Sequence, residues 1–277
     1  MLDPNFPNRL LKSGYQRTME FIHFLFEDYS KRDLTEKTDR AVATSGLEVS
    51  IARSLKCQSK YGIFERYLHR NLLWQASDNK MERIEYPTRN MPSWSWMAYN
   101  GGIQFMDIPF GTADWIDNLR FDEGHELALI TDIGEFRDCT MEPDGKYYAI
   151  LDFGRTKRGW IQYDVEEDED IFKEQCVVVG KKSIEDGDSE DGDNEDGDSE
   201  DGDNEDGDSE EWDNEDRDSE DGDNEDGDNE DGDRLDVKEY YILVVRPTSV
   251  DGEYKRVGVG LIQSDYVVRQ RLNVRVV

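Results

Sequence analysis

Residues 240–261, YYILVVRPTSVDGEYKRVGVGL, carry the strongest β-sheet signal in this 277-residue chain. Residues 240–245 form a continuous apolar run of aromatic and branched side chains, which is typical of a buried strand. Asp251 and Gly252 then give a turn signal, after which Val257, Val259 and Leu261 alternate with glycine. The segment therefore predicts two strands joined by a turn.

Further short strands are predicted on both sides of this segment, from alternating or continuous apolar residues bounded by turn signals. They lie around Ile103, Phe105 and Ile108, at 126–130, at 147–153 after the turn signal Pro143-Asp144-Gly145, at 161–165, at 176–179 and at 272–276. Many short strands joined by turns favour an antiparallel sandwich or barrel.

Three helical patterns precede these strands. Residues 17–29 predict a largely buried helix, because apolar side chains cover most of its sides: Met19, Ile22, Phe26 and Tyr29 in one row, widened by Phe21, Phe24 and Leu25. Asp33 and Glu36 match a capping box and predict a second helix that runs toward Leu55, with Gly46 inside it. Residues 61–74 are amphipathic with a helical period and predict a third.

Helices first and strands later indicate an α+β fold rather than a repeated βαβ unit. We expect a helical region at 1–90, a β-rich region at 91–184, an acidic pentapeptide repeat at 185–233, and at 234–277 the closing strands of the same β-rich region.

The acidic repeat carries almost all of the net charge of −33. Between Glu185 and Asp233 there are 30 acidic residues and a single base, Arg217, whereas the other 228 residues have 36 acidic and 32 basic side chains. With only Trp212 as a large apolar residue, the repeat is predicted to be disordered. It does not match an EF-hand, because Asp196 stands where that loop needs glycine, so we expect only weak, nonspecific binding of divalent cations.

Composition also predicts a cellular location. The three cysteines, Cys57, Cys139 and Cys176, are far apart and odd in number, which favours a reducing compartment. No signal-peptide pattern and no long apolar segment is present. We therefore expect an intracellular, cytoplasmic protein without a membrane partner.

No catalytic, cofactor or metal motif is visible. The three histidines, His23, His69 and His125, have no metal-ligand spacing, and the chain has no GxSxG, no phosphate-binding loop and no basic stripe for nucleic acid. We predict no enzyme activity. An unrecognised hydrolase that depends on His23 or His125 stays open as an alternative, because catalytic triads assemble from distant residues.

The most distinctive short motif is Pro92-Ser93-Trp94-Ser95-Trp96. In a strand, Trp94 and Trp96 would point to the same face. Two indoles on one face either fill a core or form a stacking platform, so a carbohydrate- or ligand-binding domain that uses Trp94 and Trp96 is a second alternative.

Several motifs in this chain resemble those of fungal heterokaryon-incompatibility (HET) proteins, in the region that follows their HET domain. They are Tyr29-Ser30-Lys31-Arg32-Asp33-Leu34-Thr35 with Asp39, Leu72-Leu73-Trp74, Pro92–Trp96, Cys176–Gly180, and the hairpin from Tyr240 to Gly260. The resemblance covers about residues 27–109 and 174–262. The HET domain itself is not visible ahead of Tyr29, and we expect it to be missing.

The resemblance implies a non-enzymatic C-terminal module of a HET-type fungal protein. Such a module would have a regulatory or protein-interaction role in non-self recognition. Its protein partners are not specified by any motif.

Overall fold

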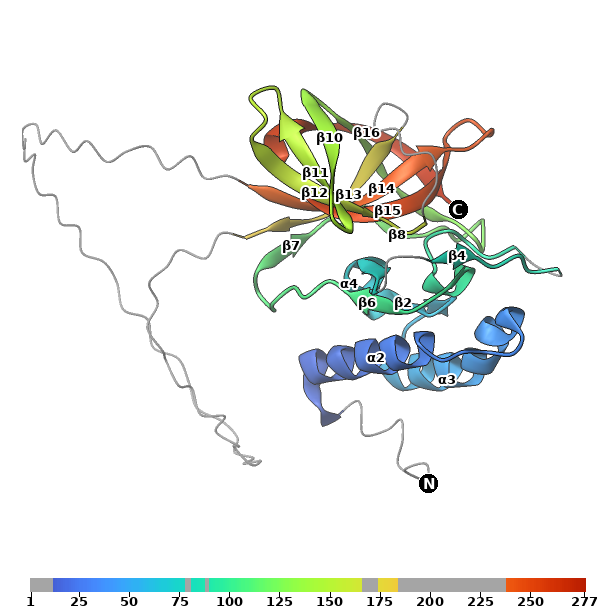
Figure 1. Ribbon diagram of the computed structural model, residues 1–277. Helices are drawn as coiled ribbons and strands as arrows, with labels where there is room; N and C mark the ends of the chain where they lie inside the picture. The colour runs from blue at the N-terminus through green and yellow to red at the C-terminus, as the bar shows by residue number, and fades with distance from the viewer. Residues whose placement is uncertain (1–11, 78–80, 88–89, 166–173, 184–237) are drawn as a thin grey trace, which may run out of the picture. The chain divides into compact units, whose positions relative to one another are not determined.

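The computed structural model describes residues 12–77, 81–87, 90–165, 174–183 and 238–277, which all belong to one compact unit (Figure 1). The predictions for the acidic repeat, disorder and cation binding, fall outside these residues. The described part is α+β, with N-terminal helices and one large, mostly antiparallel sheet.

The first two predicted helices are present, although the second begins later than predicted. Helix α2 spans Gly14–Ser30, and α3 spans Arg40–Leu55 after the short 3-10 helix η1, Lys37–Asp39. Asp33 is therefore not the cap of α3. The buried Arg40 guanidinium ties α3 to the end of α2, because it donates to the Ser30 carbonyl at 2.6 Å and to the Gly101 carbonyl at 3.2 Å.

The predicted helix at 61–74 is wrong. Two short strands, β1 (Ser59–Lys60) and β2 (Ile63–Phe64), form a hairpin there, followed by η2 (Glu65–Tyr67), α4 (Leu68–Leu72) and β3 (Trp74–Ala76). The chain reverses at Tyr61 and Gly62, whose φ angles are 51° and 79°. Positive φ at both central residues is the mark of a tight hairpin turn and cannot belong to a right-handed helix.

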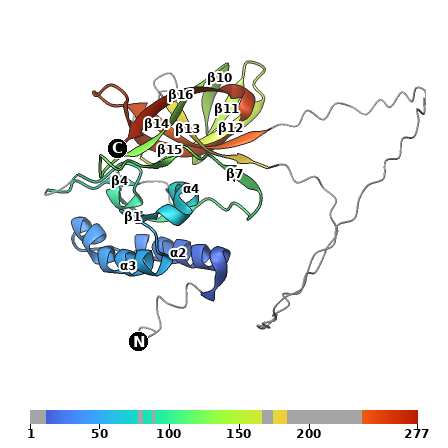
Figure 2. The ribbon, with the colours of Figure 1, turned by 180° about the vertical axis from the view of Figure 1, so that it is seen from behind.

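Two further pairs of short strands lie between the helices and the large sheet (Figures 1 and 2). Strand β3 pairs with β6 (Ile103–Phe105), and β4 (Glu82–Arg83) pairs with β5 (Tyr99–Asn100). Helix α2 holds β6 by two side-chain bonds, because the Ile103 amide donates to Ser30 Oγ at 2.9 Å and the Phe105 amide to Glu27 Oε1 at 2.8 Å.

Within the described residues, the large sheet has ten strands. They are β7 (Ala113–Trp115), β8 (Arg120–Phe121), β9 (Leu129–Phe136), β10 (Cys139–Asp144), β11 (Tyr147–Asp152), β12 (Lys157–Tyr163), β13 (Gln175–Lys182), β14 (Glu239–Pro247), β15 (Glu253–Gln263) and β16 (Val267–Val276). The order is β10-β11-β12-β15-β14-β13-β9-β16. Strand β16, at the end of this order, also forms a short parallel pairing with β15.

Most strand predictions agree with these bounds. The β14–β15 hairpin is confirmed, and so are the strands at 147–153, 161–165, 176–179 and 272–276, apart from residues at their ends. Ile108 and residues 126–128 lie outside strands, so only the last two residues of the strand predicted at 126–130 belong to one, and Pro143 lies within β10 rather than in the turn. Strand β10 is at the edge of the sheet, where a residue without an N–H group is tolerated.

The central strands bury both faces, which accounts for their continuous apolar runs. In β13, Val177 and Val179 pack into the core shared with the helices, whereas Cys176 and Val178 pack into a second core on the other face. Leu243 and Val244 of β14 divide between the two cores in the same way. Side chains alternate along a strand, so a strand covered on both sides needs apolar residues at every position.

Candidate functional site

Trp94 and Trp96 do not form a binding platform. Residues 92–95 turn, with the Ser95 amide donating to the Pro92 carbonyl at 3.1 Å, and the 3-10 helix η3 (Trp96–Ala98) follows. This segment is therefore not a strand. Both indoles are fully buried, with 0% exposure, so neither presents a face on which a sugar could stack. The alternative in which the two side chains fill the core is the one that agrees with the structure.

The two tryptophan motifs contact each other directly. Trp74 Nε1 donates to the Trp94 carbonyl at 3.0 Å, and Trp94 Nε1 donates to the Leu127 carbonyl at 3.0 Å. Ser93 connects these motifs to the large sheet. Its Oγ accepts from the Arg256 amide at 2.7 Å and donates to the Val277 carbonyl, next to the end of β16. These motifs join the helical part to the sheet.

Arg256 is the centre of this junction. Its guanidinium makes two bonds to the Asp164 carboxylate, at 2.9 and 3.0 Å, and donates to the carbonyls of Leu72 at 2.6 Å and Trp74 at 2.5 Å. It also lies 3.5 Å from the centre of the Trp74 ring. Burial raises the pKa of the Asp164 carboxyl, whereas the Arg256 guanidinium acts to lower it. Four hydrogen bonds therefore hold the guanidinium, two of them to the Asp164 carboxylate.

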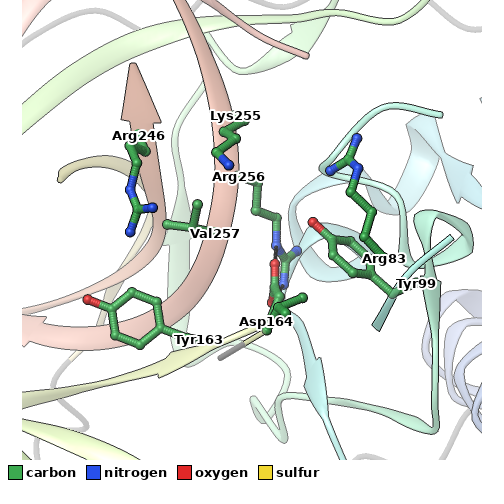
Figure 3. Close-up of a pocket in the computed structure, with 9 residues that line it drawn as sticks. Arg83, Tyr99, Tyr163, Asp164, Arg246, Lys255, Arg256 and Val257 are labelled. Carbon is green, nitrogen blue, oxygen red and sulfur yellow. Dashed lines mark hydrogen bonds and ion pairs between the residues drawn. The ribbon is translucent and has the colours of Figure 1, made fainter. Parts of the chain in front are cut away.

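A small cavity beside this pair is lined by several charged side chains (Figure 3). Its volume is about 20 Å³, and its lining includes Arg83, Tyr99, Tyr163, Arg246 and Lys255. Figure 3 shows the Arg256 guanidinium turned toward Asp164 and that of Arg246 turned toward Tyr163. A space of this size holds roughly one water molecule, so it is too small for an organic substrate.

A wider cleft of about 840 Å³ lies at the ends of β9, β13 and β14. Its most buried charge, Glu174, accepts from Arg246 Nη2 at 2.7 Å and from the Tyr163 hydroxyl, so the carboxylate is held in place. Cys139 lines the cleft, but burial raises the pKa of its thiol to about 11. That thiol is protonated at neutral pH and is therefore a poor nucleophile.

His23, one of the two histidines of the hydrolase alternative, is held between an asparagine and a phenylalanine, and His125 Nδ1 is buried without a hydrogen-bond partner among the described residues. His23 Nε2 lies 3.0 Å from Asn71 Nδ2, and its ring stacks on Phe105 at 3.8 Å. Asn71 Oδ1 accepts from the Phe64 amide at 3.1 Å, so Nδ2 is the donor and His23 Nε2 the acceptor. Within the described residues, no histidine is hydrogen-bonded to a serine, threonine or cysteine.

Burial and the neighbouring Arg70 lower the pKa of His23 from its ordinary value of 6.5 to about 3. As the pH falls, the His23 imidazole is therefore protonated in the unfolded chain before it is protonated in the folded one. The contribution of neutral His23 to the free energy of unfolding is complete above pH 6.5 and is lost as the pH falls toward 3. We expect wild-type stability to fall in this window by about 1.4 kcal/mol per pH unit more steeply than that of a His23→Phe variant. Urea unfolding at several pH values measures both slopes, and parallel curves would contradict a neutral, buried His23.

The helices carry a second feature, which we call the outer helical face. It is defined by Phe21 and Phe24 of α2 and Val42 and Val49 of α3, with exposures of 38, 65, 63 and 53%. The buried residues of α2 and α3 lie on the opposite sides of these helices, against the rest of the unit. The prediction that Phe21 and Phe24 widen a buried row is therefore wrong, because only one side of α2 meets the core.

Sequence analysis missed both the Arg256–Asp164 pair and the outer helical face. Arg256 follows a turn in an alternating strand, where a charged residue is expected to face solvent. A surface helix needs only one apolar stripe to face the core. Apolar residues outside that stripe, such as Phe21 and Phe24, were therefore the signal for an exposed apolar face.

In the part of the chain that the structure describes, no group of three or more His, Cys, Asp or Glu side chains is placed to hold a metal ion. None of the helices in this part of the chain is long and apolar enough to cross a membrane.

No protein-family model matches the chain, and no curated protein or solved structure is significantly similar to it.

Proposed function

We propose that this chain is a non-enzymatic protein-interaction module that binds a protein partner through the outer helical face. The observation that carries the proposal is the exposure of Phe24, Val42 and Val49 on neighbouring helices, with charged residues such as Arg17 and Arg53 around them. Large apolar side chains that gather on an exposed face mark interaction sites in soluble proteins.

The biological role proposed here is regulatory, in fungal non-self recognition. It rests on the resemblance of residues 72–74 and 92–96 to the region that follows the HET domain. The contacts of these motifs suit a module whose helical and sheet parts must stay together. We further propose that the large sheet is a small barrel rather than a sandwich, because its pairings return from β16 to β15.

Two observations support the non-enzymatic part of the proposal. The buried Asp164 carboxylate is held by two bonds from Arg256, and Cys139 and His23 have pKa values that favour their neutral forms. The three cysteines are free thiols, which supports a cytoplasmic location. Activity on a panel of esters and glycosides that is lost in a His125→Ala variant would overturn this part.

Affinity capture from fungal cells tests the interaction role. We expect proteins that bind the wild-type chain to be lost with a Phe24→Asp variant and kept with a Phe153→Asp variant. Phe153 is a matched control, because it is a phenylalanine with 79% exposure on the turn after β11. Circular dichroism establishes that both variants fold. If the same proteins bind all three chains, the outer helical face is not the binding site.

A further inference from the structure

Helix α3 presents a regular row of exposed residues on its outer side. The row begins with Asp39, the residue just before α3, and continues with Val42, Gly46, Val49 and Arg53, at spacings of three, four, three and four residues. Residues with these spacings lie on one stripe of a helix. The buried residues of α3, such as Thr44, Ile51 and Leu55, lie on the opposite side, so the row faces away from the core.

The row is open at its centre. A Cβ atom built on Gly46 would meet no described atom within 4 Å, so nothing in the described unit covers the helix at this point. Without a side chain at Gly46, the backbone of a second helix can approach closely. Glycine in the middle of an exposed helix otherwise only weakens it, by about 1 kcal/mol relative to alanine.

The charges of the row have opposite signs at its two ends. Asp39 is seven residues before Gly46, and Arg53 is seven residues after it. Both side chains are exposed, and neither forms an ion pair or a hydrogen bond with another described side chain. The row is therefore complementary to a second copy of itself that runs in the opposite direction. In such a pair, Asp39 of each copy would lie opposite Arg53 of the other.

We infer that the partner of the outer helical face is a second copy of this chain, with α3 crossing the α3 of that copy about a two-fold axis at Gly46. This inference rests on the function proposed above. In such an antiparallel pair, a residue n positions after Gly46 approaches the residue n positions before it in the other copy. Arg53 then meets the second copy's Asp39, because both lie seven residues from Gly46. Val49, three residues after Gly46, lies within one position of the point opposite the second copy's Val42, which is four residues before it, and each contact occurs twice by symmetry.

The size of the face sets the strength of the dimer. Helix α3 has 16 residues and is therefore about 24 Å long. Together with Phe24 on the adjacent α2, its outer side is smaller than the roughly 800 Å² per partner of a standard interface. We expect a weak, reversible dimer with a dissociation constant in the micromolar range. The net charge of −33 on each copy opposes association, so measurements need salt of about 0.15 M, where the Debye length is about 8 Å.

Sedimentation equilibrium of the full chain tests the inference. We expect a monomer–dimer equilibrium that a Val49→Asp variant abolishes and a Phe153→Asp variant leaves unchanged. Asp39→Arg and Arg53→Glu should each weaken the dimer by about tenfold or more, because each places like charges opposite one another. The two single variants change the net charge in opposite directions, so a shared loss cannot come from overall repulsion.

Mixing the two charge variants gives the decisive result. Asp39→Arg in one copy faces Arg53→Glu in the other, and the remaining Arg53 faces the remaining Asp39, so a heterodimer should form with about the wild-type affinity. A chain that is monomeric at all concentrations, or a dimer that ignores Val49→Asp, would overturn the inference. If the chain is monomeric while Phe24→Asp still loses captured proteins, the proposed function holds and only the identity of the partner is wrong.

Discussion

An Arg256→Met variant is expected to lose about 3–5 kcal/mol of unfolding free energy, because it leaves the Asp164 carboxylate buried without a counter-charge. Asp164 and Arg256 have 2% and 1% exposure, so water cannot replace the lost partner. The carbonyls of Leu72 and Trp74 lose their donors as well. Such a loss is a large part of the total stability of a typical domain, which is about 5–15 kcal/mol. Urea unfolding at pH 7 measures it.

The pH dependence of the same variant identifies the cause. Without Arg256, burial alone acts on Asp164 and raises the pKa of its carboxyl further above the unfolded value. A carboxyl with a raised folded pKa is destabilising at high pH, so the deficit relative to wild type should shrink as the pH falls. A matched control is Arg32→Met, which breaks the exposed pair with Asp28 and should cost less than about 1 kcal/mol. Equal losses in the two variants would contradict the central role of Arg256.

Arg256 also shows where the strand pattern misleads. The pairing of β14 with β15 shifts by one residue between Val244 and Val245, so Val257 is the extra residue of a β-bulge. The bulge changes which face the preceding residues occupy, and Arg256 is turned inward. A bulge has no signal in a sequence that simply alternates from Val257 onward. The charged centre of the structure was therefore hidden inside its most predictable strand.

The confirmed strands are those whose apolar pattern follows directly from which faces of a regular strand are buried. Residues 176–179 and 240–245 are apolar at every position because both faces of β13 and β14 are covered. The helix at 61–74 failed because Ile63, Phe64 and Leu68 also satisfy a helical period. The hairpin there depends on positive φ at Tyr61 as well as at Gly62, and tyrosine gives no warning of such a conformation. Local apolar spacing alone could not separate the two structures.

The outer helical face was missed for a related reason. Periodicity identifies the apolar residues of a helix, but it does not say how much of the helix the rest of the chain will cover. Phe24 is as apolar as Phe26, yet one is 65% exposed and the other is fully buried. The number of elements available to pack on α2 decides this difference. That number depends on the tertiary structure and is not encoded within residues 17–29.

Trp94→Ala and Trp96→Ala variants should each lose about 3–5 kcal/mol, because removing a buried indole leaves a cavity that its neighbours cannot fill. Trp94 packs near Phe121 and Tyr61, with ring centres 5.9 and 6.0 Å away, and Trp96 packs 5.1 Å from Phe26. A solvent-exposed platform would tolerate both changes with little loss of stability. The measurement is again urea unfolding, and a loss below about 1 kcal/mol in either variant would restore the platform hypothesis.

Phenylalanine substitutions separate the two indoles further. Trp94 Nε1 donates to the Leu127 carbonyl, whereas Trp96 Nε1 is buried without a hydrogen-bond partner among the described residues. Trp94→Phe therefore removes a bond and leaves a carbonyl unsatisfied, while Trp96→Phe removes an N–H group that had no partner. Because an unsatisfied buried group costs about 1–3 kcal/mol, Trp94→Phe should be the more destabilising of the two by an amount of that order. Equal losses would mean that the Leu127 bond contributes nothing, and that only the volume of these side chains holds the junction together.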